Sequence, residues 1–488
     1  MVIACAAPRV GPGPPGYQRR RPEATVLYQV VARELRTFLA RVESREGPGL
    51  PGFVRRELGA LLNCGILAKG FARVRCKACG DDLLVAFSCK GRGVCPSCGG
   101  RRMADTAAHL VDRVLPRVPV RQWVLSLPFS LRFLVAFDRE LCRRVRTVFM
   151  ESVLAASRRR ARRQGVRDGR SGAVVFVQRF GGALNLNVHF HALVLDGVFH
   201  DEPGHEGRAR SPRFRVARRL HDGELADVLQ TIEAKIGAVL QRRQLEEASA
   251  QADLAARSPE LAAAQAASIQ GRLAFGPRRG QRVTRVGRGP GVPFTQPSRP
   301  DCVQHDGFSL HAGVCVTGTD REGLERLCRY VARPAVATER LSELPDGRIA
   351  YDLRHPWSDG TTRVVFEPQS FLEKLAALVP PPRAHLVTYH GVLAPAAAMR
   401  SRVVPSPTAA RRCRGEAGSS ASARRYPWAE LLKRVFAVDV LSCHRCGGRR
   451  EVLALITEGS VVRAILECVG LPTEGPVVHP ARGPPELF

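Results

Sequence analysis

The alternation of apolar and polar residues is most regular between Leu184 and Phe199, which reads LNLNVHFHALVLDGVF. Through the first half, a strand would carry apolar side chains on one face and two asparagines, His189 and His191 on the other. Two imidazoles at this spacing can bind one divalent cation without rearranging the backbone. The pattern is equally typical of a half-buried strand whose polar face meets solvent, so both interpretations stay open here.

Other periodic patterns predict the elements around this strand. Apolar residues at three-to-four spacing predict helices over 24–42, 51–63, 105–114, 139–163, 320–331 and 369–377, and one or two helices over 222–270. Alternating or β-branched runs predict strands over 83–87, 122–127, 173–178 and 308–316. A glycine-containing turn at 179–183 would pair strand 173–178 with the histidine strand as a hairpin, and residues 200–218 read as a loop. We therefore predict an α+β fold around an antiparallel or mixed sheet.

The net charge of the chain indicates a type of binding partner. The chain of 488 residues carries a net charge of +30, which indicates a polyanion such as nucleic acid, although a GC-rich coding sequence also favours arginine. Membrane-surface binding would require a basic amphipathic helix with an aromatic face, and the sequence predicts none. It also contains no run of eighteen apolar residues that could span a membrane. Fifteen cysteines without a secretory signal favour metal-bound and free thiols in a reducing cytoplasm.

Two CxxC motifs predict a structural metal site. Cys76 and Cys79 form one knuckle, and Cys95 and Cys98 form another fifteen residues further on. A short hairpin between them could bring four thiolates around one Zn²⁺ ion in a zinc ribbon.

Four further cysteines leave alternatives open. Cys64 and Cys89 could replace a knuckle cysteine or join a second site, but we expect both to be small buried residues. Cys443 and Cys446 form a lone CxxC in the tail. The sequence does not settle whether it binds zinc, and the residues that could complete it are Cys413, Cys468 and His444.

Basic residues and a tyrosine add candidate chemistry. Arg101 and Arg102 follow the second knuckle and could touch phosphates, or be a solvated surface. Tyr330 lies near the end of helix 320–331 with Arg329 and Arg333 beside it. A helical tyrosine usually closes a core, but next to a His-x-His strand in a basic protein it suggests a nucleophile for a DNA phosphodiester.

The chain resembles a known family over residues 25 to 457. The stretches that carry the resemblance are CGILAKGFARVRC, FSCKGRGVCPSCGGRRM, QRFGGALNLNVHFHALVLDGVF, FSLHAGVCV, LCRYVARPAVATERL, YHGVLAP and WAELLKRVFAVDVLSCHRCGG. They resemble the rolling-circle transposases of insertion sequences, the IS ninety-one class, within the HUH endonuclease superfamily.

This resemblance implies a mechanism. Tyr330 would attack single-stranded transposon ends to give a 5′-phosphotyrosine link and a free 3′-OH. His189 and His191 would hold Mg²⁺ or Mn²⁺, with Gln178 a candidate third ligand, and Arg329 and Arg333 would bind DNA. The partners would be single- and double-stranded DNA, and the chain could form a homodimer.

The sequence departs from part of that family at one position. Some members carry a second tyrosine four residues before the first, and Arg326 stands there in this chain. Exchange between two tyrosines of one subunit is therefore in doubt. One tyrosine would need sequential transfers, a second subunit, or resolution by the free 3′-OH.

The resemblance also implies a domain order. It places an HUH palm, with helices on one face of its sheet, after the zinc ribbon and before a small C-terminal α+β region. The expected parts are a disordered tail (1–24), a zinc-binding DNA-binding domain (25–112), the catalytic domain (115–345) with a basic insertion at about 241–300, its extension (346–402), a linker (403–425) and a tail with a lone CxxC (426–488).

Two other functions fit the same residues. One is a zinc-dependent DNA-binding protein without catalysis, such as a degraded transposase copy. The other is a plasmid replication initiator or relaxase with the same HUH core. The ribbon ahead of the core and the WAELLKRVF stretch favour the transposase, which we expect in the bacterial cytoplasm at the nucleoid.

Overall fold

The structure, a computed structural model, describes residues 19–43, 49–201, 212–246, 258–287, 301–405, 426–436 and 439–483. Of the expected disordered tail, residues 1–18 lie outside this range. Residues 19–24 are ordered: Arg19 pairs with Glu23 at 2.8 Å, and a 3₁₀ helix, η1, covers Pro22–Ala24. Most of the expected linker, at 406–425, and parts of the expected basic insertion, at 247–257 and 288–300, also lie outside the described residues.

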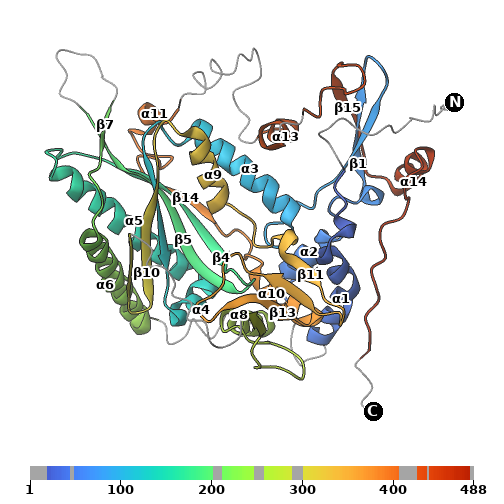
Figure 1. Ribbon diagram of the computed structural model, residues 1–488, viewed down its shortest axis with the longest axis horizontal. Coiled ribbons are helices and arrows are strands. Elements are labelled where there is room, and N and C mark those ends of the chain that lie inside the picture. The colour runs from blue at the N-terminus through green and yellow to red at the C-terminus, as the bar shows by residue number, and fades with distance from the viewer. Residues whose placement is uncertain are drawn as a thin grey trace.

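A six-stranded antiparallel sheet forms the centre of the molecule (Figure 1). Its strand order is β14-β4-β5-β3-β10-β9. The bounds are β3 Val120–Ser126, β4 Gly172–Phe180, β5 Leu186–Leu195, β9 Cys302–His305, β10 Phe308–Val316 and β14 Val387–Gly391. The predicted β4–β5 hairpin forms, and the histidine strand β5 lies inside the sheet between β4 and β3.

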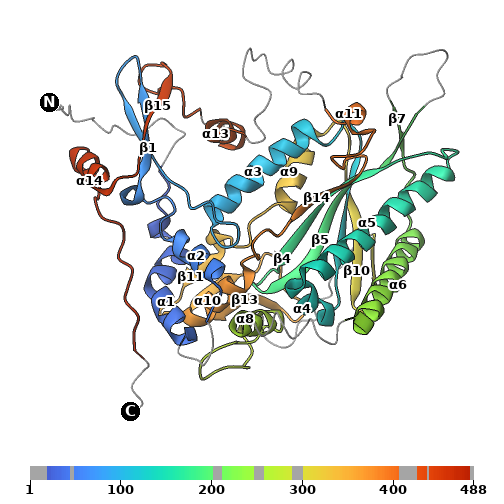
Figure 2. The ribbon, with the colours of Figure 1, turned by 180° about the vertical axis from the view of Figure 1, so that it is seen from behind.

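Helices cover both faces of this sheet, whereas the expected palm has them on one face (Figures 1 and 2). On the histidine face lie α3 (Pro96–Arg113) and α9 (Arg321–Val331), which share a core with Leu193 and Leu195 of β5. Against the other face, around Phe190, lie α4 (Phe129–Phe137), α5 (Arg139–Arg162), α6 (Asp222–Glu246) and α8 (Pro259–Ile269). The second half of β5 is therefore buried on both sides, as its continuous apolar run would require.

A second body of helix and sheet continues from this core. The sheet β11-β12-β13-β8 packs with α10, and α1 packs on both α10 and β11, with Phe38 and Phe371 in one shared cluster. The bounds are α1 Val26–Glu43, α2 Gly52–Leu61, β8 Thr284–Gly287, β11 Leu341–Glu343, β12 Ile349–Asp352, β13 Thr361–Phe366 and α10 Pro368–Leu378. The region 241–300, expected to be a basic insertion, thus supplies α8 and β8 to the folded body.

Both ends of the chain meet in a third sheet, β15-β1-β2 (Figure 1, blue and red at upper right). β1 (Phe71–Cys76) and β2 (Asp82–Ala86) form a hairpin, and β15 (Arg450–Ile456) adds to it antiparallel to β1. The short helices α13 (Trp428–Phe436) and α14 (Gly459–Cys468) flank this sheet in the chain. The tail is therefore built into the zinc-binding region.

The remaining short elements complete the described chain. Of the stretch 200–218, read as a loop, residues 202–211 lie outside the described residues, and on either side of them β6 (Gly197–His200) pairs with β7 (Arg213–Val216). Further elements are η2 Leu67–Lys69, η3 Thr338–Arg340 and α11 Arg400–Val403. Within the described ranges, no helix is long and apolar enough to cross a membrane.

Candidate active site and metal centres

Two histidines and one tyrosine meet on the face of the sheet beneath α9. The imidazole centroids of His189 and His191 lie 4.9 Å apart. The ring of Tyr330 meets His191 edge-on, with centroids 5.9 Å apart and planes at 84°. Tyr330 is 38% exposed, so solvent or a substrate can reach its side chain.

The helix that carries Tyr330 is fixed at its start and along one side. Asp320 caps α9, because its carboxylate accepts a hydrogen bond of 2.7 Å from the backbone N–H of Gly323. Leu324, Leu327 and Val331 are buried against the sheet. This packing turns Tyr330 to the rim, where it borders the histidine pair.

Hydrogen bonds fix the orientation of both imidazoles. Nδ1 of His189 lies 2.9 Å from the carbonyl oxygen of Asn187, an acceptor only, so Nδ1–H donates and Nε2 keeps its lone pair. The amide of Gln122 lies 2.8 Å from Nδ1 of His191, and Nε2 of His191 is buried without a partner. The atom of Gln122 that lies there is Nε2, which donates, so Nδ1 accepts and the ring proton of His191 is on Nε2; turning the amide over would present Oε1 to Nδ1 and free Nε2 for a metal.

Burial keeps both imidazoles neutral near pH 7. Burial first, with Arg333 nearby as a further cause, lowers the pKa of His189 to about 4. Burial and then the neighbouring His189 lower the pKa of His191 well below its ordinary value. Neutral rings are the form that ligates metals.

Gln178 is the nearest candidate for a third ligand. It lies opposite His189 in the β4–β5 register, and its Nε2 donates to the carbonyl of Val331 at 2.8 Å. Its Oε1 is buried without a hydrogen-bond partner. Among the described residues, no group of three His, Cys, Asp or Glu ligands includes His189 or His191. With Gln178 the candidate donor set is two imidazoles and one amide oxygen, and Oδ1 of Asn187, on the same face of β5, is likewise buried without a partner.

The two arginines beside Tyr330 differ in their partners. Arg333 stacks over the Tyr330 ring at 4.8 Å and over Phe180 at 5.5 Å, forms no ion pair with a described residue, and buries its Nε without a partner. Burial lowers the pKa of its guanidinium. Arg329 instead pairs with Glu325 at 2.6 Å. Arg326, at the position of the second tyrosine, pairs with Glu322 at 3.8 Å.

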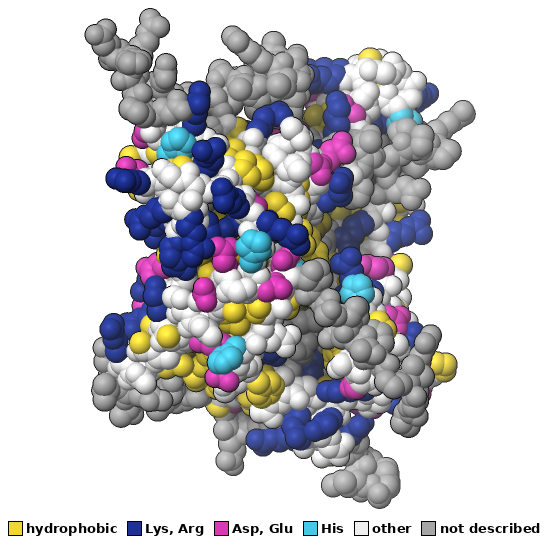
Figure 3. Space-filling model, turned by 60° about the vertical axis from the view of Figure 1, so that its left-hand side comes forward, with side chains coloured by type: hydrophobic (Ala, Val, Ile, Leu, Met, Phe, Trp, Pro, Cys, Tyr) yellow, Lys and Arg dark blue, Asp and Glu magenta, His cyan; other side chains and the backbone are white. Residues whose placement is uncertain are grey.

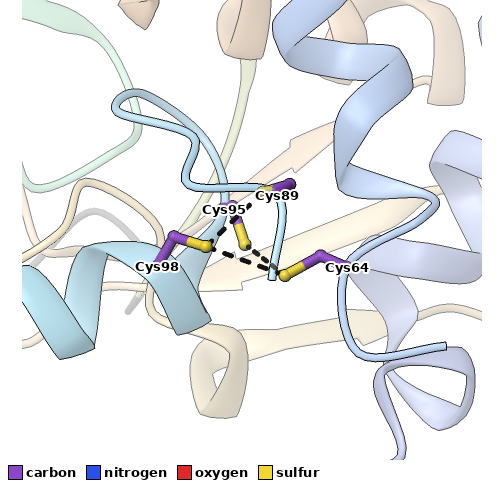
Figure 4. Close-up of side chains that lie close together, drawn as sticks. All are labelled: Cys64, Cys89, Cys95 and Cys98. Atoms are coloured by element: carbon purple, nitrogen blue, oxygen red, sulfur yellow. Dashed lines mark hydrogen bonds between the residues drawn. The ribbon is translucent and has the colours of Figure 1, made fainter. Parts of the chain in front are cut away.

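Four thiols form a first metal centre (Figure 4). Cys64 follows α2, Cys89 follows β2, and Cys95 and Cys98 begin α3. The Sγ atoms of Cys64 and Cys98 lie 3.7 Å apart, and the Cys89–Cys98 and Cys95–Cys64 distances are both 3.5 Å. Around Zn²⁺ with Zn–S bonds of about 2.3 Å, the edges of a tetrahedron are about 3.8 Å long, so this set fits zinc.

The predicted grouping of Cys76, Cys79, Cys95 and Cys98 in one site is corrected by this geometry. Cys95 and Cys98 gather with Cys64 and Cys89, which we had expected to be merely buried. Cys76 and Cys79 gather instead with Cys443 and Cys446 of the tail.

The hairpin explains the correction. Cys76 and Cys79 lie at the turn between β1 and β2, whereas the chain reaches Cys89 only after β2 has run back to the base. A five-residue strand spans roughly 17 Å, which is too far for one ion to bridge. The signal available in the sequence was the count: these cysteines number eight, which is two complete sets of four.

The first metal centre lies beside the tyrosine helix. A Cβ on Gly99, next to Cys98, would lie 2.6 Å from Cβ of Pro334, just beyond α9. Arg101 and Arg102 follow in α3, both exposed, and Arg102 also donates to the carbonyl of Lys90 at 3.2 Å. Basic side chains thus continue from the zinc-binding thiols onto the surface.

A further basic surface lies around the end of α5 and β7. Figure 3, which brings this side of Figure 1 forward, shows Lys and Arg side chains gathered on one part of the face. The exposed arginines of these segments are Arg158, Arg159, Arg162, Arg163, Arg167, Arg170, Arg213, Arg215, Arg218 and Arg219. Such a surface attracts polyanions.

Two family models match the chain. The model described as "Transposase zinc-binding domain" matches residues 34–127, and the one described as "Putative transposase" matches residues 172–402. Together they span about two thirds of the chain. No curated protein and no solved structure matches it.

The matches identify a DNA transposase with an N-terminal zinc-binding domain. The chain belongs to the IS ninety-one class of insertion-sequence transposases that its motifs resemble. A protein of this kind binds DNA, cleaves it and transfers strands.

Proposed function

We propose that the transposase cleaves single-stranded transposon ends with Tyr330 as the nucleophile, in a rolling-circle type of transposition. The single observation that carries this proposal is the contact between Tyr330 and His191, because it sets a half-exposed phenol beside a pair of oriented imidazoles. A phosphodiester entering from solvent can meet both groups at once.

The reaction balances without a hydrolytic water. Oη of Tyr330 attacks the phosphorus in line, forming a P–O(Tyr) bond while the P–O3′ bond breaks. The phenolic proton is lost to solvent, and the leaving 3′ oxygen takes up a proton to become a free 3′-OH. In strand transfer, another 3′-OH attacks the same phosphorus and releases the tyrosine. The bond energy is kept in the phosphotyrosine between the two steps.

His189, His191 and the amide oxygen of Gln178 would hold a divalent ion, Mg²⁺ or Mn²⁺. The fit rests on two buried atoms without partners, Oε1 of Gln178, which is an acceptor, and Nε2 of His191, which becomes one when the Gln122 amide turns. Such an ion supplies Lewis-acid polarisation of the scissile phosphate. The amide oxygen of Gln178 and the phosphate oxygens of the substrate suit Mg²⁺ and Mn²⁺.

Arg333 would bind the phosphate that Tyr330 attacks. Its guanidinium lies over the phenol ring, and no carboxylate of the described residues neutralises it. Arg329 contributes less because Glu325 already pairs with it. Arg101 and Arg102 would contact DNA further away, where α3 leaves the first metal centre.

The chain presents one tyrosine on α9, since Arg326 stands one turn before it. A full cycle therefore needs two sequential transfers at Tyr330 or a homodimer that supplies a second Tyr330. Mixing wild-type chains with Tyr330→Phe chains distinguishes these two alternatives. If each step uses the tyrosine of a different subunit, a mixed dimer should make a single nick but fail to join the strands.

The test uses oligonucleotides of the transposon ends with Mn²⁺. With a label at the 3′ end, the protein should retain the label through denaturing electrophoresis. With a label at the 5′ end, the label should leave on a shorter strand with a free 3′-OH. Tyr330→Phe should abolish both products, and Tyr389→Phe, on strand β14, should keep them.

The opposite labelling pattern would overturn a 5′ link. Tight binding without any adduct would support a zinc-dependent DNA-binding protein without catalysis. Cleavage confined to a replication origin or a transfer origin would support an initiator or a relaxase.

A further inference from the structure

Four thiols from opposite ends of the chain converge at the tip of the three-stranded sheet. Sγ of Cys76 lies 3.5 Å from Sγ of Cys446, and Sγ of Cys79 lies 3.6 Å from Sγ of Cys443. All four lie within 4.8 Å of one another. We propose that they bind a second structural Zn²⁺ ion, which closes the N-terminal and C-terminal segments into one zinc ribbon.

The spacing separates this interpretation from a pair of disulfides. A disulfide requires an S–S distance of about 2.0 Å. A tetrahedral Zn²⁺ site with Zn–S bonds of about 2.3 Å has S···S edges of about 3.8 Å. The observed distances of 3.5 and 3.6 Å are close to the zinc value and match those of the first metal centre.

The two knuckles have the same local shape. Cys76–Gly80 and Cys443–Gly447 both read CxxCG, with glycine φ angles of +73° and +71°. In each, the glycine N–H donates to the carbonyl of the first cysteine, at 3.0 and 2.8 Å. These turns point two sulfurs of each knuckle towards the other pair, and a left-handed glycine permits that bend.

A third glycine keeps the space between the knuckles open. The N–H of Gly448 lies 3.4 Å from Sγ of Cys446, a contact that stabilises a thiolate. A Cβ at Gly448 would come within 3.1 Å of that sulfur and 3.2 Å of Sγ of Cys76. A side chain at this position would therefore require the neighbouring sulfurs to shift by a few tenths of an ångström.

A second possible set of ligands at this position, which includes Asp81 and His444, is already bonded to other side chains. Asp81 and His444 approach Cys443, but the Asp81 carboxylate forms an ion pair with the buried Arg450, and Nδ1 of His444 lies 2.7 Å from the same guanidinium. Outside their own cluster the thiols make weak contacts: Sγ of Cys443 lies 3.8 Å from the Asp81 carboxylate, and Sγ of Cys446 accepts from the N–H of Gly448 at 3.4 Å. They are the set that an incoming ion would find available.

The proposed ion would anchor a segment that reaches the tyrosine helix. Arg434 of α13 pairs with Asp112 of α3 and with Glu325 of α9, each at 2.5 Å. The hydroxyl of Tyr426 donates to Asp112 at 2.7 Å. Zinc at one end and this ion-pair network at the other would hold the C-terminal segment across the histidine face of the molecule.

Both family matches stop short of Cys443 and Cys446, so neither assigns this site.

The test is zinc counted per chain by plasma mass spectrometry on the full-length protein. We expect two zinc ions in the wild type and one in the double variant Cys443→Ser/Cys446→Ser. Cys76→Ser/Cys79→Ser should also hold one. Cys315→Ser, which changes an exposed cysteine outside both clusters, should keep two.

A second measurement guards against loss of folding. In hydrogen exchange, removing Cys443 and Cys446 should speed exchange in β1 and β15 and leave α1 unchanged. Two zinc ions in the Cys443→Ser/Cys446→Ser variant, or one in both it and the wild type, would overturn the proposal. Unchanged exchange in β1 would likewise overturn the claim that this ion closes the ribbon.

Discussion

The ring of Tyr330 meets the ring of His191 edge-on at 5.9 Å, although 139 positions of chain separate them. The contact joins α9 to the middle of the central sheet. Because α9 is capped by Asp320 and buried along one side, the phenol has a defined place beside the histidine pair. The proposed cleavage of DNA depends on this position of the Tyr330 side chain.

Replacing His191 by alanine should lower the rate of DNA cleavage by about 100-fold or more, since the imidazole would hold the ion that polarises the phosphate. Binding of single-stranded DNA should change only a few-fold, because phosphate contacts come from arginines. Single-turnover kinetics measure the cleavage rate, and fluorescence anisotropy measures DNA binding. Equal losses of binding and cleavage would assign His191 to the fold instead.

Arg333→Ala should weaken binding of single-stranded DNA and reduce the slope of log Kd against log salt concentration by about 0.7, the value for one lost phosphate contact on a single strand. Arg329→Ala is the matched control, one turn earlier on α9. Its guanidinium is already paired with Glu325, so its slope should change less. A larger change for Arg329 than for Arg333 would reverse the roles assigned to them.

Gly99→Ala should destabilise the protein by about 1–3 kcal/mol, because the new Cβ would lie 2.6 Å from Cβ of Pro334. At Gly100, the next residue of the same helix, nothing lies within 4 Å of a new Cβ. Gly100→Ala should therefore stabilise α3 by up to about 1 kcal/mol. Opposite signs in denaturant unfolding would show that the first metal centre packs against the end of α9, whereas equal signs would contradict that contact.

His390 should make stability depend on pH. Burial, and then the charge of Arg146, lowers the pKa of its imidazole to about 4 in the folded protein, while the unfolded chain has the ordinary value of about 6.5. The folding free energy is therefore unaffected above pH 6.5. As pH falls from 6.5 towards 4, the unfolded state binds the proton first and stability is lost.

The matched comparison for this effect is His390→Gln, which cannot titrate. Between pH 7 and pH 5 the wild type should lose about 1 kcal/mol more than the variant, after allowance for the partial exposure of the ring. Unfolding in urea at both pH values measures the difference. A variant that loses as much as the wild type would exclude His390 as the source.

Local patterns predicted the elements of the fold well. The strand 308–316 and helices such as 139–163 appear within a residue or two of their expected bounds, because each has a strong period and clear ends. The prediction that helices cover only one face of the sheet was wrong. The run Ala192–Leu195 is apolar at every position and already indicated burial on both sides.

The metal centres were harder to predict because they depend on pairings between distant segments. The sequence identified the cysteines but grouped them by proximity along the chain. Cys76 pairs with Cys446 only because β15 adds to β1, and a strand pairing across 370 residues leaves no local trace. Strand alternation had already indicated that His189 and His191 share one face of their strand, whereas no pattern in the sequence indicated which face of its helix Tyr330 occupies.

Gln122 was missed for a related reason. Its side chain orients His191 from β3, the neighbouring strand, and a lone glutamine in an apolar strand carries no recognisable pattern. Gln122 faces Leu193 in the register and reaches His191 diagonally, a relationship that becomes visible only when the strand register is known.

The measurement that tests the central claim most directly is peptide mapping of the covalent DNA adduct. After cleavage of a transposon end in Mn²⁺, nuclease and protease digestion followed by tandem mass spectrometry should find a nucleotide 5′-phosphate on Tyr330. A modified peptide that contains Tyr389 or any other residue, or an unmodified Tyr330 peptide in protein that has demonstrably cut the strand, would contradict the account.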